Sequence, residues 1–227
     1  ASMIGKIAAF TEEERIAKIS GMLDQLEWRD GRETAGSVAK KVKRNLQAVA
    51  TDEAGKAIRA ELGPLIADNR VVRAAARPRR ISALMISKTA DGGHYGPHVD
   101  NAVMGKGQNR LRTDISFTIF LSHSEDYEGG ELVIHTAGLT QVVKGEWGQL
   151  VLYPSTSIHE VKPVTKGARV VCVGWIESLI ADPTQRELLF DLENLRTSLR
   201  QKMDHQSPEL LTLDKSMSNL VRMWSQT

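Results

Sequence analysis

One cysteine stands among the 227 residues, so the chain cannot form an internal disulfide bond. This residue, Cys172, lies between Val171 and Val173, which predicts a buried thiol within a strand. No apolar run approaches the roughly 20 residues that a membrane-spanning helix needs, and the first residues lack the basic segment and apolar core of a secretory signal. We therefore expect a cytoplasmic protein without a membrane span, whose natural start is Met3.

The chain also lacks an excess of either charge. Its 30 basic and 28 acidic side chains leave a formal net charge of +2, so no global field favours nucleic acid or an anionic membrane as a partner. We expect a small-molecule or peptide substrate instead. Two local basic runs are interpreted as solvated faces, with contact to an anionic substrate or partner as the alternative. The runs comprise Lys40, Lys41, Lys43 and Arg44, and separately Arg70, Arg73, Arg77, Arg79 and Arg80.

The N-terminal third has helical periodicity. Apolar residues recur at steps of three and four over residues 11–27 and again over residues 51–66, which predicts two helices. Thr11 and Glu14 have the spacing of a capping box at the start of the first helix. These helices are expected to support a core that is formed elsewhere in the chain.

Residues 81–176 consist of short β-branched or aromatic runs separated by Gly, Asp and Pro, a pattern typical of an all-β sandwich or barrel. The clearest predicted strand covers residues 114–122, where apolar and hydroxyl side chains alternate between two faces. Its apolar face carries Ile115, Phe117, Ile119 and Leu121, and its other face carries Ser116, Thr118 and Ser122. Further strands are predicted at residues 131–136, 149–153 and 169–175.

After the strands, helical periodicity returns. Asp182-Pro183 and Ser207-Pro208 each predict the start of a helix with an apolar stripe. These stripes suit either packing on the β-core or a homodimer interface, and the sequence favours neither. The expected architecture is mainly β with flanking helices. We divide it into helical support at residues 3–80, a catalytic β-core at 81–178 and a helical extension at 179–227.

Three residues in the β-region form a candidate metal site. His98 and Asp100 are two positions apart, so on a strand their side chains point to the same face. His159 follows far enough along the chain to reach the same place from another strand. Two imidazoles and one carboxylate occupy one face of an octahedron and leave the other open, an arrangement typical of non-haem Fe(II) oxygenases. Of the other histidines, His94 is interpreted as a solvated or substrate-gating residue.

Arg169 provides a second candidate element of this site. It lies across a turn at Pro163 to Gly167 from the strand-like segment after His159, so two successive strands are expected to bring both residues into one cavity. A keto acid that chelates iron through its 1-carboxylate and keto oxygen leaves its far carboxylate without a partner. The planar guanidinium of Arg169 matches such a carboxylate with two parallel hydrogen bonds.

The spacing of these residues resembles that of the prolyl 4-hydroxylase-like oxygenases and, within them, the PKHD-type hydroxylases. The resemblance runs nearly from end to end of the chain. It rests on His98-x-Asp100, on His159-x-Val161-x-Pro163-Val164-x-x-Gly167-x-Arg169, and on the segments Gly96–Ala102, Arg112–Ser116, Tyr127–Leu132, Leu152–Pro154 and Leu188–Leu192.

The resemblance implies a double-stranded β-helix (jelly-roll) core and hydroxylation of a substrate with release of succinate and CO2. It further implies that His98, Asp100 and His159 bind Fe(II) and are the catalytic residues, and that Arg169 binds the 5-carboxylate of the co-substrate 2-oxoglutarate. O2 would be the second co-substrate and L-ascorbate a helper reductant. One departure stands out: at 86–89 the chain has Ile-Ser-Lys-Thr in place of a segment that ends in tyrosine in similar proteins, which suggests a reshaped pocket wall.

Several interpretations remain open from the sequence. Arg112 and Asp114 suit either substrate orientation or a buried ion pair, and Trp175 suits either the cavity floor or the core. Residues 28–37 suit a packed loop, with a lid formed by Trp28 and 34–36 as the alternative. Two other functions compete with a hydroxylase: oxidative demethylation of nucleic acid at the same site, and a cupin-like metal-binding protein without oxygenase activity. The identity of the substrate is not readable.

Overall fold

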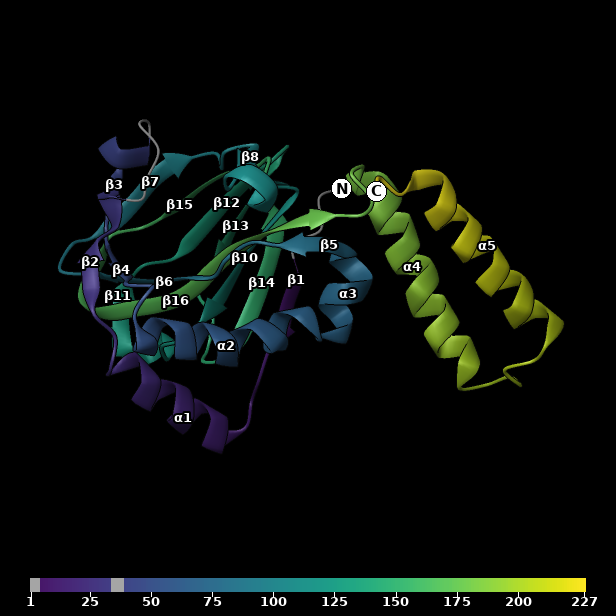
Figure 1. The fold of residues 1–227 in the computed structure, drawn as a ribbon, viewed down its shortest axis with the longest axis horizontal. Coiled ribbons are helices and arrows are strands. Elements are labelled where there is room, and N and C mark those ends of the chain that lie inside the picture. The colour runs from purple at the N-terminus through teal and green to yellow at the C-terminus, as the bar shows by residue number, and fades with distance from the viewer. Residues whose placement is uncertain (1–4, 34–38) are drawn as a thin grey trace.

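The computed structural model describes residues 5–33 and 39–227 and has three layers (Figure 1). A large β-sheet lies in the middle, a smaller sheet faces one side of it, and helices cover the other side. The covering helices are α1 (Glu13–Leu23), α2 (Glu53–Ala67) and α3 (Arg70–Ala76). The two facing sheets form a double-stranded β-helix, or jelly roll, as the family resemblance implies.

The large sheet has nine strands, of which seven follow the order β1-β14-β10-β16-β6-β4-β2, while β5 and β11 pair with β16 off this path. Its strands are β1 (Gly5–Ala8), β2 (Trp28–Asp30), β4 (Leu46–Ala48), β5 (Pro78–Ile81), β6 (Met85–Ala90), β10 (Ile115–Phe120), β11 (Tyr127–Gly129), β14 (Gln149–Pro154) and β16 (Val164–Ser178). The long strand β16 pairs along its length with β6, β10, β11 and β5, so it forms the spine of this sheet.

The small sheet has five strands in the order β13-β12-β15-β7-β3. Its strands are β3 (Lys43–Arg44), β7 (His94–His98), β12 (Leu132–Thr136), β13 (Leu139–Val143) and β15 (Ile158–Val161). A separate pair, β8 (Val103–Met104) and β9 (Leu111–Arg112), lies off both sheets. Short 3-10 turns occur at Gly31–Glu33, Ala39–Lys41, Gly107–Asn109 and Ser124–Asp126.

The alternation predicted for residues 114–122 separates the two faces of the large sheet, one in the apolar core and the other towards a cavity. Ile115, Phe117 and Ile119 on β10 pack into the core beneath the helices, as predicted, together with α2 side chains. Ser116 and Thr118 point the other way, into a cavity between the sheets. Burial of the apolar face stabilises the helix layer, at roughly 25 cal/mol per Å² of apolar surface removed from water.

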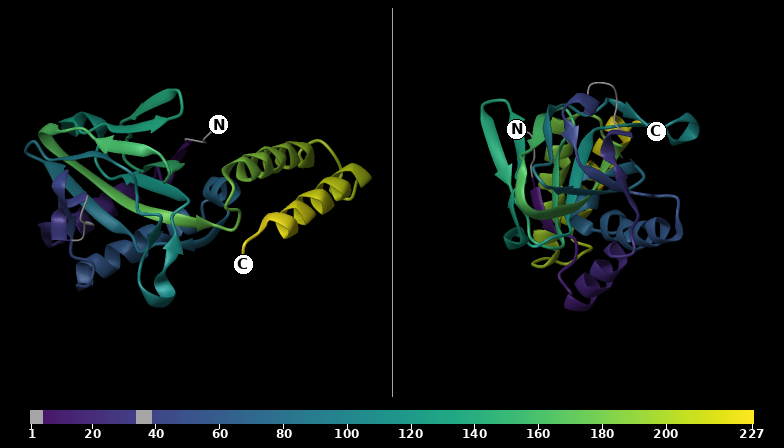
Figure 2. Two further views of the ribbon diagram at one scale, coloured as in Figure 1. Left: turned by 90° about the horizontal axis from the view of Figure 1, so that it is seen from above. Right: turned by 90° about the vertical axis from the view of Figure 1, so that its left-hand side faces the viewer.

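The C-terminal helices α4 (Pro183–Arg200) and α5 (Pro208–Trp224) form an antiparallel pair that projects from the β-core, as Figures 1 and 2 show. Both predicted caps are confirmed. Asp182 accepts a hydrogen bond from the Gln185 amide at 2.9 Å, and Ser207 accepts one from the Leu210 amide at 3.4 Å. The pair packs mainly on α3 and does not cover the β-core.

The N-terminal region differs from the sequence prediction in its strands and in one cap. β1 pairs with β14, β4 with β6 and β3 with β7, so this region contributes strands to both sheets as well as helices. The predicted capping box is wrong: the helix starts after Glu12, and no side chain caps it. The first helix is therefore shorter than predicted, and α3 was not predicted.

Candidate metal centre and active-site cavity

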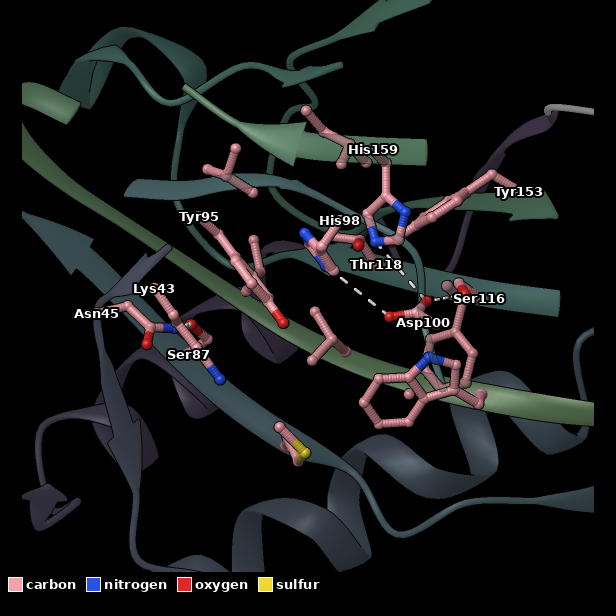
Figure 3. Close-up of a pocket in the computed structure, with 18 of the residues that line it drawn as sticks. Lys43, Asn45, Ser87, Tyr95, His98, Asp100, Ser116, Thr118, Tyr153 and His159 are labelled. Atoms are coloured by element: carbon pink, nitrogen blue, oxygen red, sulfur yellow. Dashed lines mark hydrogen bonds and ion pairs between the residues drawn. The ribbon is translucent and has the colours of Figure 1, made fainter. Parts of the chain in front are cut away.

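The two sheets enclose a cavity of about 530 Å³. Its walls come from β10, β14 and β16 of the large sheet, from β7 and β15 of the small sheet, and from β3, β4 and β6 at one end. His98, Asp100, His159 and Arg169 all line it, so the four candidate residues lie in one cavity. Figure 3 shows the first three of them. The volume lies within the range of small-molecule sites.

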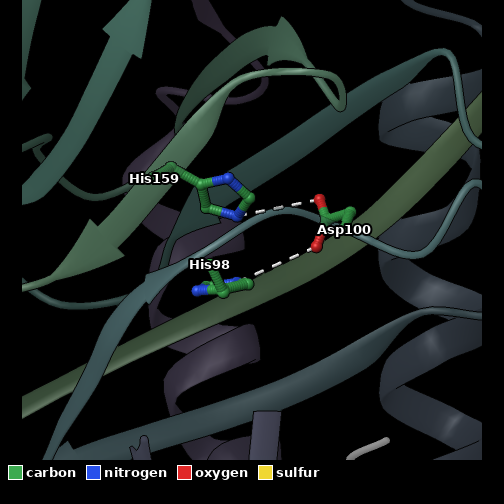
Figure 4. Close-up of side chains that lie close together, drawn as sticks. All are labelled: His98, Asp100 and His159. Atoms are coloured by element: carbon green, nitrogen blue, oxygen red, sulfur yellow. Dashed lines mark ion pairs between the residues drawn. The ribbon is translucent and has the colours of Figure 1, made fainter. Parts of the chain in front are cut away.

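The candidate metal ligands meet where β7 ends beside β15. His98 is the last residue of β7 and pairs directly with His159, which lies within β15 and not before a strand as the sequence suggested. Asp100 follows two residues later and turns its carboxylate towards both rings, with one oxygen facing each (Figure 4). Its oxygens lie 3.9 Å from Nε2 of His98 and 3.7 Å from Nε2 of His159. One ligand atom from each residue lies within 4.8 Å of the others, which suits a single metal ion.

Backbone carbonyls fix the chemical form of both histidines. Nδ1 of His98 lies 2.8 Å from the Gly96 carbonyl oxygen, and Nδ1 of His159 lies 3.0 Å from the Ser157 carbonyl oxygen. A carbonyl oxygen only accepts, so each Nδ1 carries the proton and donates it. Each Nε2 is then left with a free lone pair that faces Asp100, which is the tautomer that binds metals.

Two buried serines hold the carboxylate of Asp100. The Ser116 hydroxyl donates to Oδ2 of Asp100 at 2.6 Å, and its oxygen lies 2.7 Å from the Ser155 hydroxyl oxygen. Because Ser116 donates its only hydroxyl proton to Asp100, the Ser155 hydroxyl must donate to the oxygen of Ser116. The chain of hydroxyls sets the orientation of the carboxylate.

Aromatic rings pack around the histidines. The Tyr95 ring stacks on His98 with centroids 3.6 Å apart, and the Tyr153 ring meets the His159 ring edge-on at 5.1 Å. Burial, followed by the charge of the neighbouring His159, lowers the pKa of His98 to about 4. Burial also raises the pKa of Tyr95 to about 12. Near neutral pH, His98 is therefore neutral and able to bind a metal, and Tyr95 keeps its hydroxyl proton.

Arg169 is a buried cation without an acidic partner. It is 3% exposed, and in the described part of the chain no carboxylate lies within salt-bridge distance of it. Its Nε has no hydrogen-bond partner, and its guanidinium lies 5.7 Å from the Phe120 ring centroid. Burial lowers the pKa of Arg169 from its usual value, although a guanidinium stays charged at any physiological pH. An unpaired buried cation is costly, so this position suits an anionic ligand.

Known proteins share both parts of this architecture. Residues 84–177 match the 2OG-Fe(II) oxygenase superfamily, and residues 184–226 match the PKHD-type hydroxylase C-terminal domain. A PKHD-type hydroxylase of Hyphomonas neptunium is 50% identical over 210 residues, which cover 92% of this chain and 94% of the relative. The chain belongs to the PKHD-type hydroxylases. A PKHD-type hydroxylase of Synechococcus elongatus is 43% identical over 224 residues, 99% of this chain and 100% of that one.

Solved structures share the fold of this PKHD-type hydroxylase at low identity. A Trichoplax adhaerens prolyl hydroxylase in complex with a peptide of hypoxia inducible factor has a TM-score of 0.58 and 18% identity, over 82% of this chain and 86% of that chain. A Pseudomonas putida prolyl-4-hydroxylase has a TM-score of 0.52 and 19% identity, over 78% and 94% of the two chains. These likenesses support the jelly-roll core.

Membership in the family makes this chain an Fe(II)- and 2-oxoglutarate-dependent hydroxylase that also uses O2. The donor set fits the metal, since two neutral imidazoles and a carboxylate leave coordination positions open. Neither a nucleic-acid demethylase nor a cupin-like protein without oxygenase activity gains support from the comparisons. Within the described residues, no helix has the length and apolar character needed to cross a membrane.

Arg112 and Asp114 form an ion pair outside the cavity. The Arg112 guanidinium donates twice to the Asp114 carboxylate, at 2.7 and 2.9 Å, and once to the Gln226 side chain at 2.7 Å. Asp114 also accepts a hydrogen bond from the Ser178 amide at 2.8 Å. The pair therefore fastens the C-terminal tail and the end of β16 to the β-core, which favours the ion-pair interpretation over substrate orientation.

The structure places three further residues whose positions the sequence left open: Trp175, Trp28 and His94. Trp175 lines the cavity, and its buried Nε1 has no hydrogen-bond partner. Trp28 packs against the core under the helices, and the proposed lid residues 34–36 lie outside the described part of the chain. His94 is half-buried and does not line the cavity, so it stands apart from the metal site.

The departure at residues 86–89 shapes one end of the cavity. Ser87 and Thr89 on β6 line it, and Thr89 pairs directly with Arg169 across the sheet. Small hydroxyl side chains thus lie beside the arginine, and Thr89 occupies the position at which the similar segment is expected to end in tyrosine. The hydroxyl of Ser87 accepts a hydrogen bond from the Asn45 amide group at 2.6 Å.

Several residues that line the cavity have no predicted role in the sequence. Ser116 was assigned only to the polar face of its strand, although that alternation was the available signal. Ser155 and Tyr95 gave no signal, because their positions depend on strand pairing. Tyr153 lies in Leu152–Pro154, a segment on which the resemblance rests, but no role was predicted for it. Lys43 was assigned to a solvated basic run, yet it is 7% exposed and lines the cavity.

Proposed function

We propose that this hydroxylase inserts oxygen into a C–H bond of a small molecule, an amino-acid derivative or a protein side chain, while 2-oxoglutarate is decarboxylated to succinate and CO2. We assign Fe(II) binding to His98, Asp100 and His159, and binding of the 5-carboxylate of 2-oxoglutarate to Arg169. One observation carries the assignment: a buried cation without an acidic partner shares a 530 Å³ cavity with a convergent two-histidine, one-carboxylate cluster.

The chain's own groups would position the reactants. Bound Fe(II), together with 2-oxoglutarate and O2, supplies the oxidising chemistry. The carbonyl-bound Nδ1 atoms of His98 and His159 hold both imidazoles with Nε2 turned inward. Ser116 holds the orientation of the Asp100 carboxylate through its hydrogen bond to Oδ2. Arg169 would fix the far end of the co-substrate, so that its keto acid end meets the open side of the ligand cluster.

The cavity walls would exclude bulk water from the reacting atoms. Leu132, Val161 and Val171 line the cavity beside the polar residues, and Leu132 and Val171 are almost fully buried. Electrostatic interactions are stronger in such a dry space, which favours tight binding of the co-substrate carboxylate.

Co-substrate turnover tests this proposal without knowledge of the substrate. Wild-type protein with Fe(II), O2 and 2-oxoglutarate labelled at carbon 1 is expected to release labelled CO2 slowly in the absence of substrate. His159→Ala should abolish the release, and Arg169→Ala should raise the 2-oxoglutarate concentration needed by about 10-fold or more, since a hydrogen-bonded charge is lost. His123→Ala is the matched control, because His123 is an exposed histidine away from the cavity. Undiminished release by His159→Ala would exclude this site.

We further propose that L-ascorbate sustains repeated turnover by returning oxidised iron to Fe(II). The chain's own thiol would offer no alternative reductant at this site, because Cys172 does not line the cavity. Cys172 is buried in the core under the helices. Ascorbate should then increase the number of turnovers per protein without changing the initial rate.

We also propose a cytoplasmic location and a homodimer through α4 and α5. The free, buried thiol of Cys172 suits a reducing compartment. Exposed leucines on the projecting helices, Leu188 and Leu195 on α4 and Leu211 on α5, support a contact between copies. Sedimentation of the wild type and of a Leu188→Glu/Leu195→Glu variant tests the dimer, which the double substitution should convert to monomer.

A further inference from the structure

Lys43 is a second cation in the active-site cavity. It lies on the two-residue strand β3, where side chains alternate between the faces of the sheet. Arg44 consequently points to solvent, and Lys43 is only 7% exposed and lines the same cavity as the metal cluster. Lys40 and Lys41, from the same basic run, are exposed. Strand pairing thus selects one lysine of the run and turns it inward.

The ammonium group of Lys43 has an aromatic neighbour and no acidic one. Its Nζ lies 5.2 Å from the centroid of the Tyr95 ring, whose strand pairs with β3 at this position. Within the described residues, no carboxylate lies within salt-bridge distance of Nζ, and no hydrogen bond from it is found. Lysine is almost never buried unless it is paired. Burial lowers the pKa of Lys43 to about 8, only weakly opposed by Asp30.

Tyr95 connects this lysine to the metal cluster. Figure 3 shows the Tyr95 ring between Lys43 and His98, and the same ring stacks on His98 with centroids 3.6 Å apart. One aromatic ring therefore separates the ammonium group from a candidate metal ligand. Because Lys43 and the metal cluster line the same cavity, a ligand held by Nζ can extend towards the cluster.

We propose that Lys43 binds the carboxylate of the primary substrate, and that the substrate is a small aliphatic carboxylic acid oxidised a few bonds from its acid group. This inference rests on the proposed function, in which the metal cluster and Arg169 bind 2-oxoglutarate. Of the two carboxylates of 2-oxoglutarate, one belongs with the metal and the other with Arg169. Lys43 is left for another anion.

The remaining walls of the cavity favour an aliphatic chain with a single negative charge. Val103, Met104 and Trp175 line the cavity, and Val103 is 46% exposed, so apolar surface continues to the opening. One lysine neutralises one charge. A doubly charged phosphate would leave an excess negative charge in a poorly solvated space, which is unfavourable. A monoanionic carboxylate matches both the cation and the apolar wall.

Straight-chain fatty acids from butanoate to octanoate, each paired with its uncharged carboxamide, serve as probes. Binding is measured by calorimetric titration under anaerobic conditions, on protein loaded with Fe(II) and saturating 2-oxoglutarate, so that Arg169 is already engaged. At least one acid of the series should bind about 10-fold or more tightly than its amide, as expected for a hydrogen-bonded charge pair. Lys43→Met should remove this preference, and Lys43→Arg should retain most of it.

Lys88→Met is the matched control. Lys88 stacks on an aromatic ring in the same way, with Nζ 5.6 Å from the Trp28 centroid, but it does not line this cavity. This variant should bind the acids as the wild type does. Binding of 2-oxoglutarate is titrated in every variant, which also reports whether the site is intact.

The possible outcomes distinguish failure of the proposed function from failure of the carboxylate site at Lys43. If 2-oxoglutarate fails to bind the wild type, the proposed function fails. If 2-oxoglutarate binds normally but no acid binds, or acids and amides bind equally, Lys43 is not a carboxylate site. Acid binding that survives in Lys43→Met equally overturns the inference, and leaves the lysine only its contact with Tyr95. Loss of 2-oxoglutarate affinity in Lys43→Met would assign the lysine to the co-substrate, which also contradicts the inference.

Discussion

The hydroxyl of Ser116 connects the carboxylate of Asp100 to a second buried serine, and its removal tests how the metal site is held. Its oxygen lies 2.6 Å from Oδ2 of Asp100 and 2.7 Å from the Ser155 oxygen, and both serines are 2% exposed. Ser116→Ala leaves Asp100 without this donor and Ser155 without this acceptor. A hydrogen bond to a charged group contributes about 1.5–3 kcal/mol, and loss of a group that orients a metal ligand typically weakens metal binding about 10–100-fold.

We therefore expect Ser116→Ala to weaken Fe(II) binding by a factor of about 10–100, measured anaerobically by competition with a chelating dye. Ser122→Ala is the control: Ser122 is also buried, and its hydroxyl accepts from the Val170 amide at 2.8 Å outside the cavity. It should lose some stability to urea but keep the wild-type affinity for iron. Iron affinity of Ser116→Ala within about twofold of the wild type would refute the role assigned to the serine pair.

Three further predictions follow from single contacts. Arg169→Lys should weaken 2-oxoglutarate binding at least about 10-fold with unchanged Fe(II) affinity, because one ammonium cannot replace a planar fork; equal affinity would contradict the assignment. Burial lowers the pKa of Lys43 to about 8, below the 10.5 of a free lysine. Between pH 8 and 10.5 the unfolded chain therefore keeps a proton on Lys43 that the folded chain has lost. The free energy of unfolding of the wild type consequently rises with pH across this range. Lys43→Met should thus be more stable than the wild type at pH 7, by on the order of 3 kcal/mol, with the gap closing towards pH 10.5 in urea unfolding; a constant gap would argue against burial of a charged lysine. Asp182→Ala should lower stability by about 1 kcal/mol through loss of the α4 cap, seen as earlier loss of helical circular dichroism, and no change would mean that the cap is redundant.

The parts of the site that could be predicted are those governed by local spacing. His98 and Asp100 are two residues apart, and the turn before Arg169 returns the chain to the region of His159. The two-residue period of a strand therefore predicted a shared face for His98 and Asp100, and the turn predicted that Arg169 lies near His159. The alternation in residues 115–120 indicated in the same way which side chains of β10 lie in the apolar core and which face the cavity.

The remaining parts depend on pairing between distant strands. β3 has two residues and β4 has three, too few for a periodic signal, and both exist because β7 and β6 offer free edges. The inward orientation of Lys43 follows from that pairing, so a basic run in the sequence looked like a solvated face. The hydrogen bond between Ser116 and Ser155 spans 39 residues and likewise has no local signature.

Co-substrate binding at the metal tests the central claim most directly. Fe(II)-loaded protein is titrated with 2-oxoglutarate without oxygen, and the weak visible charge-transfer band of a chelated keto acid is recorded. The account predicts a saturable band in the wild type, no band in His159→Ala, and a band in Arg169→Ala only at far higher 2-oxoglutarate concentrations. A wild type that binds iron but shows neither the band nor any affinity for 2-oxoglutarate would contradict the assigned site.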